Sequence, residues 1–130
     1  MNSLSDALLV ASSGMEAQSA RLRHVAENIA NTDTPGYRRK LITFQTEMLR
    51  RDAPAAVATG PVRLDQTDLE EIYDPSNPLA DDTGHYDGSN VNLLVEIADA
   101  REASRSYEAN LKMFEQVRQM SSALIDLLRR

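Results

Sequence analysis

The sequence predicts a mainly α-helical fold. The expected core is a discontinuous, antiparallel coiled-coil hairpin of two helices from the two ends of the chain, with a small irregular or β-hairpin insert between them. Apolar residues recur at alternating spacings of three and four near both ends. All five prolines and four of the five glycines fall within residues 31–89. With no Trp and only 5% aromatic residues, the apolar surface is aliphatic, which suits helix packing.

The first helix is expected from Leu4 to Ile29. Its apolar seam has one polar break, at Gln18, and consists of Leu4, Leu8, Ala11, Met15, Gln18, Leu22, Val25 and Ile29. Gly14 lies beside this seam, and glycine inside a helix costs about 1 kcal/mol relative to alanine. Its presence therefore indicates that a neighbouring helix approaches closely there.

The second helix is expected from about Asn92 to Leu128, with Asn90 or Asn92 as its N-cap. Its seam runs through Leu93, Ile97, Ala100, Ser104, Tyr107, Leu111 and Phe114, then shifts to Val117, Met120, Leu124 and Leu127 or Leu128. A hairpin of two helices cannot enclose both apolar faces, because each helix has only one neighbour. The pattern therefore predicts that other subunits supply further helices.

The middle of the chain is predicted to hold short strands and loops. Residues 57–59 and 62–64 are expected as two strands that turn at Gly60-Pro61, and residues 69–73 as a third. Residues 41–49 fit a strand or a short helix equally well, and residues 74–90 have the composition of a loop. We therefore divide the chain into a helical core domain, residues 1–32 and 90–130, and an outer insert, residues 33–89.

Charge and composition exclude several classes of protein. The formal net charge of −6 argues against a nucleic-acid partner. Residues 52–89 carry nine acidic residues and one basic residue, whereas the two ends are close to neutral. The absence of cysteine excludes a disulfide scaffold and a thiolate nucleophile. The sequence shows neither a membrane-spanning run nor a cleavable secretory signal.

No set of residues predicts catalysis or a cofactor. Asp81, Asp82, His85 and Asp87 do not have the spacing of a calcium loop. Glu70 and Glu71 would diverge on a strand, although acid–base catalysis needs groups that converge. Neither His24 nor His85 has an identifiable partner. We therefore predict no enzymatic activity, no metal, no cofactor and no small-molecule substrate.

A distinctive motif follows the first helix, in residues 28–39. Asn31 could adopt the left-handed conformation that ends a helix, and Pro35-Gly36 fits the centre of a type II turn. Arg38, Arg39 and Lys40 then form a basic cluster, for which a solvated charge run is the simplest interpretation.

Three blocks of sequence, in order, resemble the family of flagellar rod, hook and hook-associated proteins. The first block is the Ala30-Asn31-x-x-Thr34-Pro35-Gly36-Tyr37 motif. The second spans residues 73–81 and includes Tyr73, Pro75, Pro78 and Asp81. The third begins at Asn90 and ends with Arg105, Tyr107, Ala109 and Asn110. Residues 84–89 depart from the family's usual approach to the last helix, and the short length resembles the rod members rather than the hook.

The resemblance implies a structural subunit of the proximal flagellar rod. Its terminal helices would self-assemble into the axial drive-shaft tube, which transmits torque and encloses the export channel. It implies a location in the basal body, in the rod crossing the periplasm, with export by the flagellar type III apparatus and no cleaved signal peptide. The implied partners are copies of the chain, the rod proteins FlgB, FlgF and FlgG, and the rod-base adaptor FliE.

The helix packing that would build this tube can be assigned to the two seams. Leu8, Ala11, Met15, Leu22, Val25 and Ile29 are expected to meet Tyr107, Leu111, Phe114, Val117, Leu124 and Leu127, within and between subunits. Asn31 and Asn110 are expected to fix the register, because a buried amide without partners costs about 1–3 kcal/mol. The alternative interpretation is a soluble helical adaptor or export chaperone, which would be folded and dimeric by itself.

Overall fold

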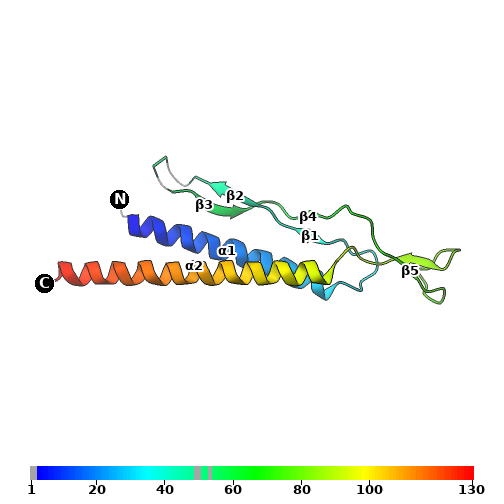
Figure 1. Cartoon of the computed structure of the whole chain (residues 1–130). Coiled ribbons are helices and arrows are strands. Elements are labelled where there is room, and N and C mark those ends of the chain that lie inside the picture. Colours follow the sequence, from blue (N-terminus) through cyan, green and yellow to red (C-terminus); the bar gives the residue numbers. More distant parts are fainter. Residues whose placement is uncertain (1–2, 49–50, 53) are drawn as a thin grey trace.

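The computed structural model describes residues 3–48, 51–52 and 54–130. Two long helices dominate it: α1, Ser3–Ala30, and α2, Leu93–Leu128. They run antiparallel and side by side, and α2 extends beyond the start of α1 (Figure 1). The mainly α-helical fold with a small β-containing insert was therefore predicted correctly, and both helices begin and end within one residue of the expected positions.

Local chemistry explains the inner ends of both helices. Asn92 caps α2, since its side-chain oxygen accepts a hydrogen bond from the amide of Leu94 at 3.0 Å. At the end of α1, the Asn31 side chain donates to the carbonyl of Glu27 at 2.9 Å. The expected left-handed conformation of Asn31 was wrong, because among the described residues only Gly36 and Gly84 have positive φ. The turn at Pro35-Gly36 is confirmed: Gly36 has φ 74°, and the amide of Tyr37 donates to the carbonyl of Thr34 at 3.2 Å.

The described residues of the insert form three antiparallel strand pairs. They are β1 (Lys40–Leu41) with β4 (Arg63–Leu64), β2 (Phe44–Glu47) with β3 (Ala56–Thr59), and β5 (Glu71–Tyr73) with β6 (His85–Asp87). The predicted hairpin at Gly60-Pro61 was wrong. Residues 56–59 and 63–64 are strands, but they do not pair with each other. Each pairs instead with part of residues 40–47. These residues overlap the segment 41–49, which fits a strand or a short helix, and its described part from residue 41 to 48 contains strands and no helix.

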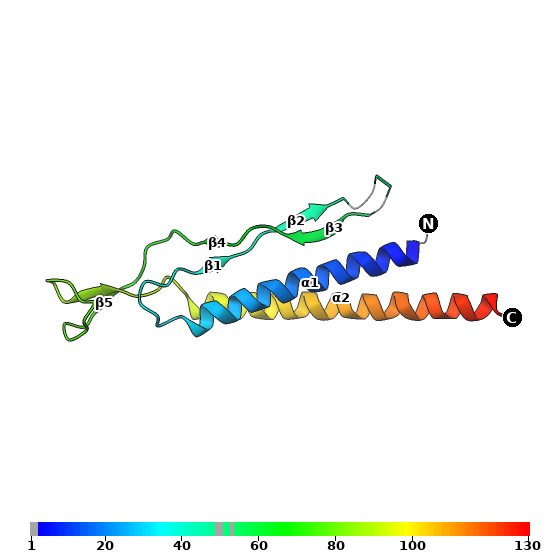
Figure 2. The same cartoon turned by 180° about the vertical axis from the view of Figure 1, so that it is seen from behind.

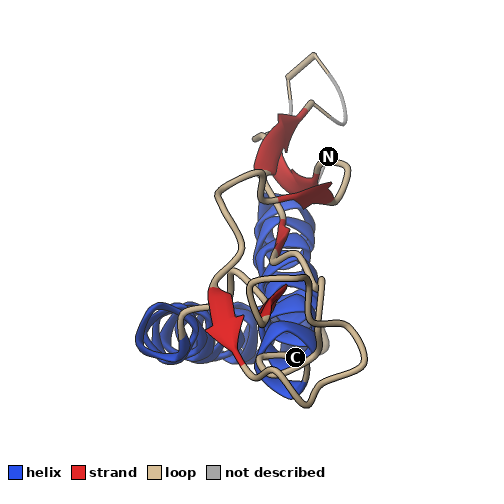
Figure 3. Ribbon diagram, turned by 90° about the vertical axis from the view of Figure 1, so that its right-hand side faces the viewer, coloured by secondary structure: helices blue, strands red, loops and turns tan. Residues whose placement is uncertain are grey.

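The strand pairs form a ribbon along the outside of the helix pair. β1 and β3 pack against α1, whereas the β5–β6 pair projects beyond the inner ends of both helices (Figure 2). Seen along the long axis, the strands nearest the N-terminus lie to one side of the helices, whereas the other strands overlap the helices in this view (Figure 3). The loop predicted over residues 74–90 was partly wrong, because it contains β6, whose partner β5 supplies the backbone hydrogen bonds that a lone strand lacks.

The contact between the helices uses small and polar residues more than large apolar ones. In α1 the buried residues are Ala11, Gly14, Ala17, Val25 and Asn28, and in α2 they are Glu96, Ala103 and Val117. The expected seam shares Ala11, Val25 and Val117 with this set, but elsewhere the buried row lies one position away. Larger residues such as Leu22, Ile29 and Ile97 therefore flank the contact instead of filling it. None of the described helices is long and apolar enough to cross a membrane.

Candidate assembly surface and the polar junction

Gly14 and Asn110 mark the closest approach of the two helices. A Cβ atom built on Gly14 would lie 2.8 Å from Oδ1 and 2.9 Å from Nδ2 of Asn110. The side-chain nitrogen of Asn110 donates a hydrogen bond to the carbonyl of Ser106 at 2.9 Å. The missing side chain of Gly14 thus makes room for the Asn110 amide, which explains a glycine inside a helix.

Nearer the insert, Asn28 is the centre of a buried polar junction. Its side-chain oxygen accepts hydrogen bonds from the Tyr37 hydroxyl at 2.8 Å and from the amide of Lys40 at 2.9 Å. Its amide nitrogen donates to the Lys40 carbonyl at 3.0 Å and to Oε2 of Glu96 at 3.3 Å. One side chain therefore ties α1 to both the insert and α2. Burial raises the pKa of Tyr37, and the nearby Glu27 raises it further.

The charged part of the junction pairs Arg39 with acidic residues of α2. Nε of Arg39 donates to Oε1 of Glu96, whose side chain is 0% exposed, and Nη2 donates to Oδ2 of Asp99 at 2.8 Å. Burial alone would lower the pKa of Arg39, but the hydrogen bond to Glu96 and the surrounding carboxylates raise it above its ordinary value. The guanidinium therefore stays charged and compensates an otherwise isolated buried carboxylate.

The insert is anchored to the same junction by residues that precede α2. Asn90 accepts a hydrogen bond from the amide of Arg39 at 2.6 Å and donates to the carbonyl of Asp65 at 2.9 Å. The hydroxyl of Ser89 donates to the carbonyl of Thr32 just after α1. Hydrogen bonds from the backbone and side chain of Thr67 lower the pKa of Asp65, and Arg39 lowers it further. The start of α2 is thus fixed relative to both α1 and the insert.

The basic cluster is built into the structure rather than solvated, contrary to its simplest interpretation. Lys40 pairs with Glu27 at 2.5 Å, which lowers the pKa of Glu27 and raises that of Lys40. Arg38 donates to the carbonyls of Asp65 and Thr67, both at 3.1 Å. Sequence reasoning missed this junction because the acidic partners lie up to 60 residues away. The available signals were a cluster of three cations after a helix and a glutamate among the apolar residues that begin α2.

Large apolar side chains are exposed along α2. Its exposed large residues are Leu93, Leu94, Val95, Ile97, Met113, Met120, Leu124, Ile125, Leu127 and Leu128. Leu124 is 50% exposed and Leu127 is 62% exposed, and every residue from 122 to 130 is exposed. We call residues 122–128 of α2 its free end, because every one of them is exposed.

The predicted packing residues fall into three groups. Ala11, Val25 and Val117 are buried. Leu8, Met15, Leu22, Tyr107, Leu111 and Phe114 are half-buried, and Ile29, Leu124 and Leu127 are exposed. The residues of the two helical seams therefore do not all meet within one chain. Leu124 and Leu127, at the free end, keep half or more of their surface exposed.

The residues of the three motifs have equally varied surroundings. Asn31, Gly36, Tyr37 and Asn90 build the end of α1 and the junction, and Thr34 donates to Asn31. Asp81 accepts from Thr83 and from the amide of His85, which lowers its pKa. The ring of Tyr73 packs against that of His85 at a tilt of 57°, with ring centroids 5.1 Å apart. The exposed motif residues are Ala30, Thr34, Pro35, Gly36, Tyr73, Pro75, Pro78, Asp81, Arg105 and Ala109.

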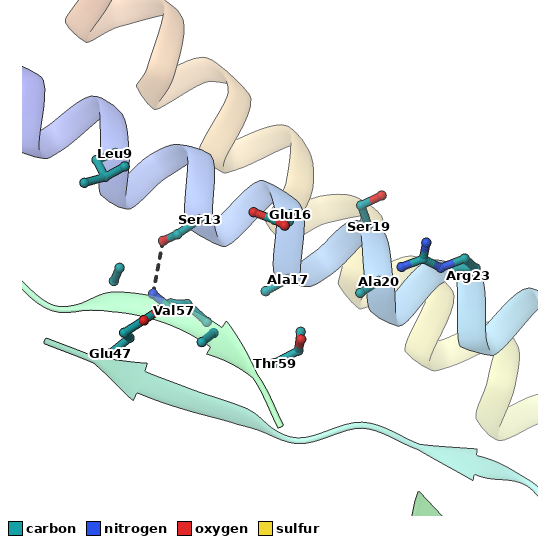
Figure 4. A pocket seen from close by; sticks show the side chains of 12 residues that line it. Leu9, Ser13, Glu16, Ala17, Ser19, Ala20, Arg23, Glu47, Val57 and Thr59 are labelled. Carbon is teal, nitrogen blue, oxygen red and sulfur yellow. Dashed lines mark hydrogen bonds between the residues drawn. The ribbon is translucent and has the colours of Figure 1, made fainter. Parts of the chain in front are cut away.

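A groove of about 590 Å³ lies between α1 and the β2–β3 pair (Figure 4). Leu9, Glu16 and Arg23 line its helical side, and Val57 and Thr59 its strand side. Ser13 bridges it, since its hydroxyl accepts from the amide of Val57 at 3.0 Å and donates to the carbonyl of Val10. The groove shows no convergent pair of acid and base. Within the described ranges, no group of histidine, aspartate and glutamate has the geometry of a metal site.

Comparison with known proteins agrees with this geometry. Two protein-family models match the chain. The family "Flagella basal body rod protein" matches residues 8–38, and the family "Flagellar basal body rod FlgEFG protein C-terminal" matches residues 83–127. A flagellar basal-body rod protein FlgC of Agrobacterium fabrum is 46% identical over 99% of this chain and 98% of its own length. The FlgC protein of Salmonella typhimurium is 35% identical over 85% of this chain and 87% of its own length. The FlgC protein of Aquifex aeolicus is 36% identical over 88% of this chain and 89% of its own length.

Two terminal helices, joined by rod-protein motifs to a small insert, define a structural protein of the bacterial flagellar basal body. The chain belongs to the FlgC family of flagellar basal-body rod proteins. It is a structural subunit of the rod and not an enzyme, and membership of the family implies assembly with other rod components. The alternative of a soluble adaptor or chaperone is not favoured.

Proposed function

We propose that the chain is a proximal-rod subunit whose helical core is completed only when neighbouring subunits cover the apolar surface of α2. The observation that carries the proposal is the free end, where Leu124, Leu127 and Leu128 are at least half exposed. Burial of apolar area contributes about 25 cal/mol per Å², so several such side chains per subunit would stabilise a polymer substantially. Assembled in this way, the helices would form the drive-shaft tube that transmits torque and encloses the export channel.

This proposal gives different tasks to the two parts of the chain. Residues 1–32 and 90–130 would form the core domain that lines the axis, and residues 33–89 would form the outer insert. The ribbon of strands on the outside of α1 supports this division. The proposed partners are copies of this chain, the rod proteins FlgB, FlgF and FlgG, the rod-base adaptor FliE and, in transit, the flagellar export apparatus.

Within the core we propose that Asn110 fixes the register of the helices. Its amide lies against Gly14, at the one place where the backbone of α1 has no side chain to exclude it. A shift by one turn would place the amide against a larger residue. Asn31, which we had given the same role, holds the end of α1 through Glu27 and Thr34 and supports the register indirectly. Normal assembly and motility of Asn110→Ala would refute the role of Asn110.

The test of the main proposal is a charge placed on the free end. Leu124→Glu and Leu127→Glu should leave the monomer as helical as the parent chain, because both side chains are already exposed. They should abolish assembly, because a neighbour would have to bury an unpaired carboxylate. Sedimentation and electron microscopy of the purified chain, together with swimming of cells that carry only the variant, measure the effect.

Gln119→Glu is the matched control. It adds the same charge to the same helix at an exposed position outside the apolar surface. It should assemble and support swimming like the parent chain. Normal assembly of the Leu124→Glu and Leu127→Glu variants would overturn the proposal, and so would equal loss of assembly in all three variants.

A further inference from the structure

A second surface, on α1 and the first half of α2, combines apolar residues with two unpaired arginines. A groove of about 360 Å³ is lined by Ile29, Ile97, Ala100, Arg101, Ser104 and Arg105. Ile97 is 44% exposed, and Ile29 is exposed as well. Neither Arg101 nor Arg105 forms a hydrogen bond or ion pair with any described residue, and the two stand one turn apart on the helix, about 6 Å between Cβ atoms. We call this the arginine groove.

The β5–β6 pair presents the opposite chemistry. Residues 68–87, which we call the acidic tip, contain seven acidic residues and no lysine or arginine. Glu71 and Asp87 stand directly opposite each other in the strand register. Like charges at such positions destabilise a strand pair, and no cation of the described structure neutralises them. The tip is therefore electrostatically incomplete within one chain.

An aromatic residue lies on the same face of the strands as these two carboxylates. Tyr73 follows Glu71 by two positions, so the two side chains point to the same side of β5. Tyr73 is 67% exposed although its ring contacts the tilted ring of His85. An exposed aromatic residue beside a pair of carboxylates is the complement of an apolar groove lined by two arginines, since arginine binds carboxylates and also stacks on aromatic rings.

The acidic tip of a chain does not bind the arginine groove of the same chain. The β5–β6 pair projects away from the helices, and hydrogen bonds hold its base: the amides of Gly36 and Gly88 donate to the carbonyls of Gly88 and Glu70, at 3.0 and 2.7 Å. We propose that the arginine groove binds the acidic tip of a second copy of this chain, with Arg101 and Arg105 paired to Glu71 and Asp87 and Tyr73 over Ile97. The contact is heterologous, so its repetition builds a ring or an open helical filament rather than a two-fold symmetric dimer.

This inference rests on the proposed assembly function and adds to it a second contact, distinct from the free end of α2. A charge exchange tests it directly. Arg101→Glu with Arg105→Glu, and separately Glu71→Lys with Asp87→Lys, should each lower the fraction of chain in filaments about tenfold or more, because like charges then face each other. All four changes in one chain should restore assembly, since every contact then has opposite charges again.

The absence of cysteine allows a direct measurement of proximity. Chains with Tyr73→Cys are mixed with chains that carry Ser104→Cys and oxidised under assembly conditions. Disulfide-linked heterodimers are expected. The control mixes Tyr73→Cys chains with Gln119→Cys chains, whose cysteine is at an exposed site of α2 outside the groove. This mixture should give few disulfide-linked heterodimers. Lys112→Glu with Arg118→Glu, which reverses two cations elsewhere on α2, should assemble like the parent chain.

The outcomes separate the two proposals. A parent chain that does not assemble at all overturns the proposed function. A parent chain that assembles, together with charge-exchange variants that all assemble equally well, overturns only the docking of the tip in the groove. The direct pairing is also overturned if both charge-reversed variants fail to assemble and the fourfold variant does not recover. It is likewise overturned if Tyr73→Cys chains cross-link only to a different rod protein.

Discussion

The two ends of α2 differ in how they are completed. At its start, Glu96 is fully buried and its charge is met by Arg39, while Asn28 binds it from α1. At the free end, aliphatic side chains lie open along the last turns. The start of the helix is thus held by specific polar contacts within the chain, whereas its free end has surface that only another molecule can cover. One helix combines a fixed junction with an open assembly surface.

Removing the central charge of the junction should have the largest effect. Glu96→Ala leaves Arg39 without its buried partner, and breaking such a pair costs about 3–5 kcal/mol. We expect urea unfolding, followed by circular dichroism, to show a loss of about 3 kcal/mol, since Arg39 keeps Asp99 as a partner. Glu108→Ala, an exposed change on the same helix, should alter the free energy of unfolding by less than about 0.5 kcal/mol.

The junction also shows what the sequence alone could not supply. Heptad spacing placed both helices, because local periodicity and caps are encoded in neighbouring residues. The motif at residues 34–37 gave the turn, because Pro-Gly restricts the backbone locally. The partners of Arg39 and the pairing of β1 with β4 depend on contacts between distant segments, so no local pattern reveals them. The helical seam moved by one position because Glu96 and Asn28, which look like surface residues, are buried by pairing.

A smaller effect is expected where the helices approach most closely. Gly14→Ala should destabilise the chain by about 1 kcal/mol, since over-packing of about 1–3 kcal/mol outweighs a gain in helix propensity of about 1 kcal/mol. In a background of Asn110→Ala the same substitution should stabilise it by about 1 kcal/mol, because the obstructing amide is gone. Equal effects of Gly14→Ala in the two backgrounds would mean that the contact with Asn110 does not matter.

The Glu27–Lys40 pair should make the junction sensitive to acid. The hydrogen bond from Lys40 lowers the pKa of Glu27 in the folded chain. A carboxyl group with a lowered folded pKa stabilises the fold above its unfolded pKa, and this contribution is lost as the pH falls through the folded value. We expect the urea concentration at the unfolding midpoint to decrease as the pH falls below about 4. The decrease should be less steep in Glu27→Gln. Glu16→Gln, which removes an exposed carboxylate that pairs with no described residue, should keep the slope of the parent chain.

The smallest effect should occur at the free end, and it tests the contrast most directly. Leu127→Ala removes apolar area that already faces solvent, so the free energy of unfolding of the monomer should change by less than about 0.5 kcal/mol. Val117→Ala, ten positions earlier, removes buried methyl groups and should cost about 2 kcal/mol. In filaments the order should reverse, with Leu127→Ala raising the concentration needed for assembly because its side chain is buried only there. A monomer that loses as much stability from Leu127→Ala as from Val117→Ala would show that the free end is already covered within one chain, and the distinction between the two ends of α2 would no longer hold.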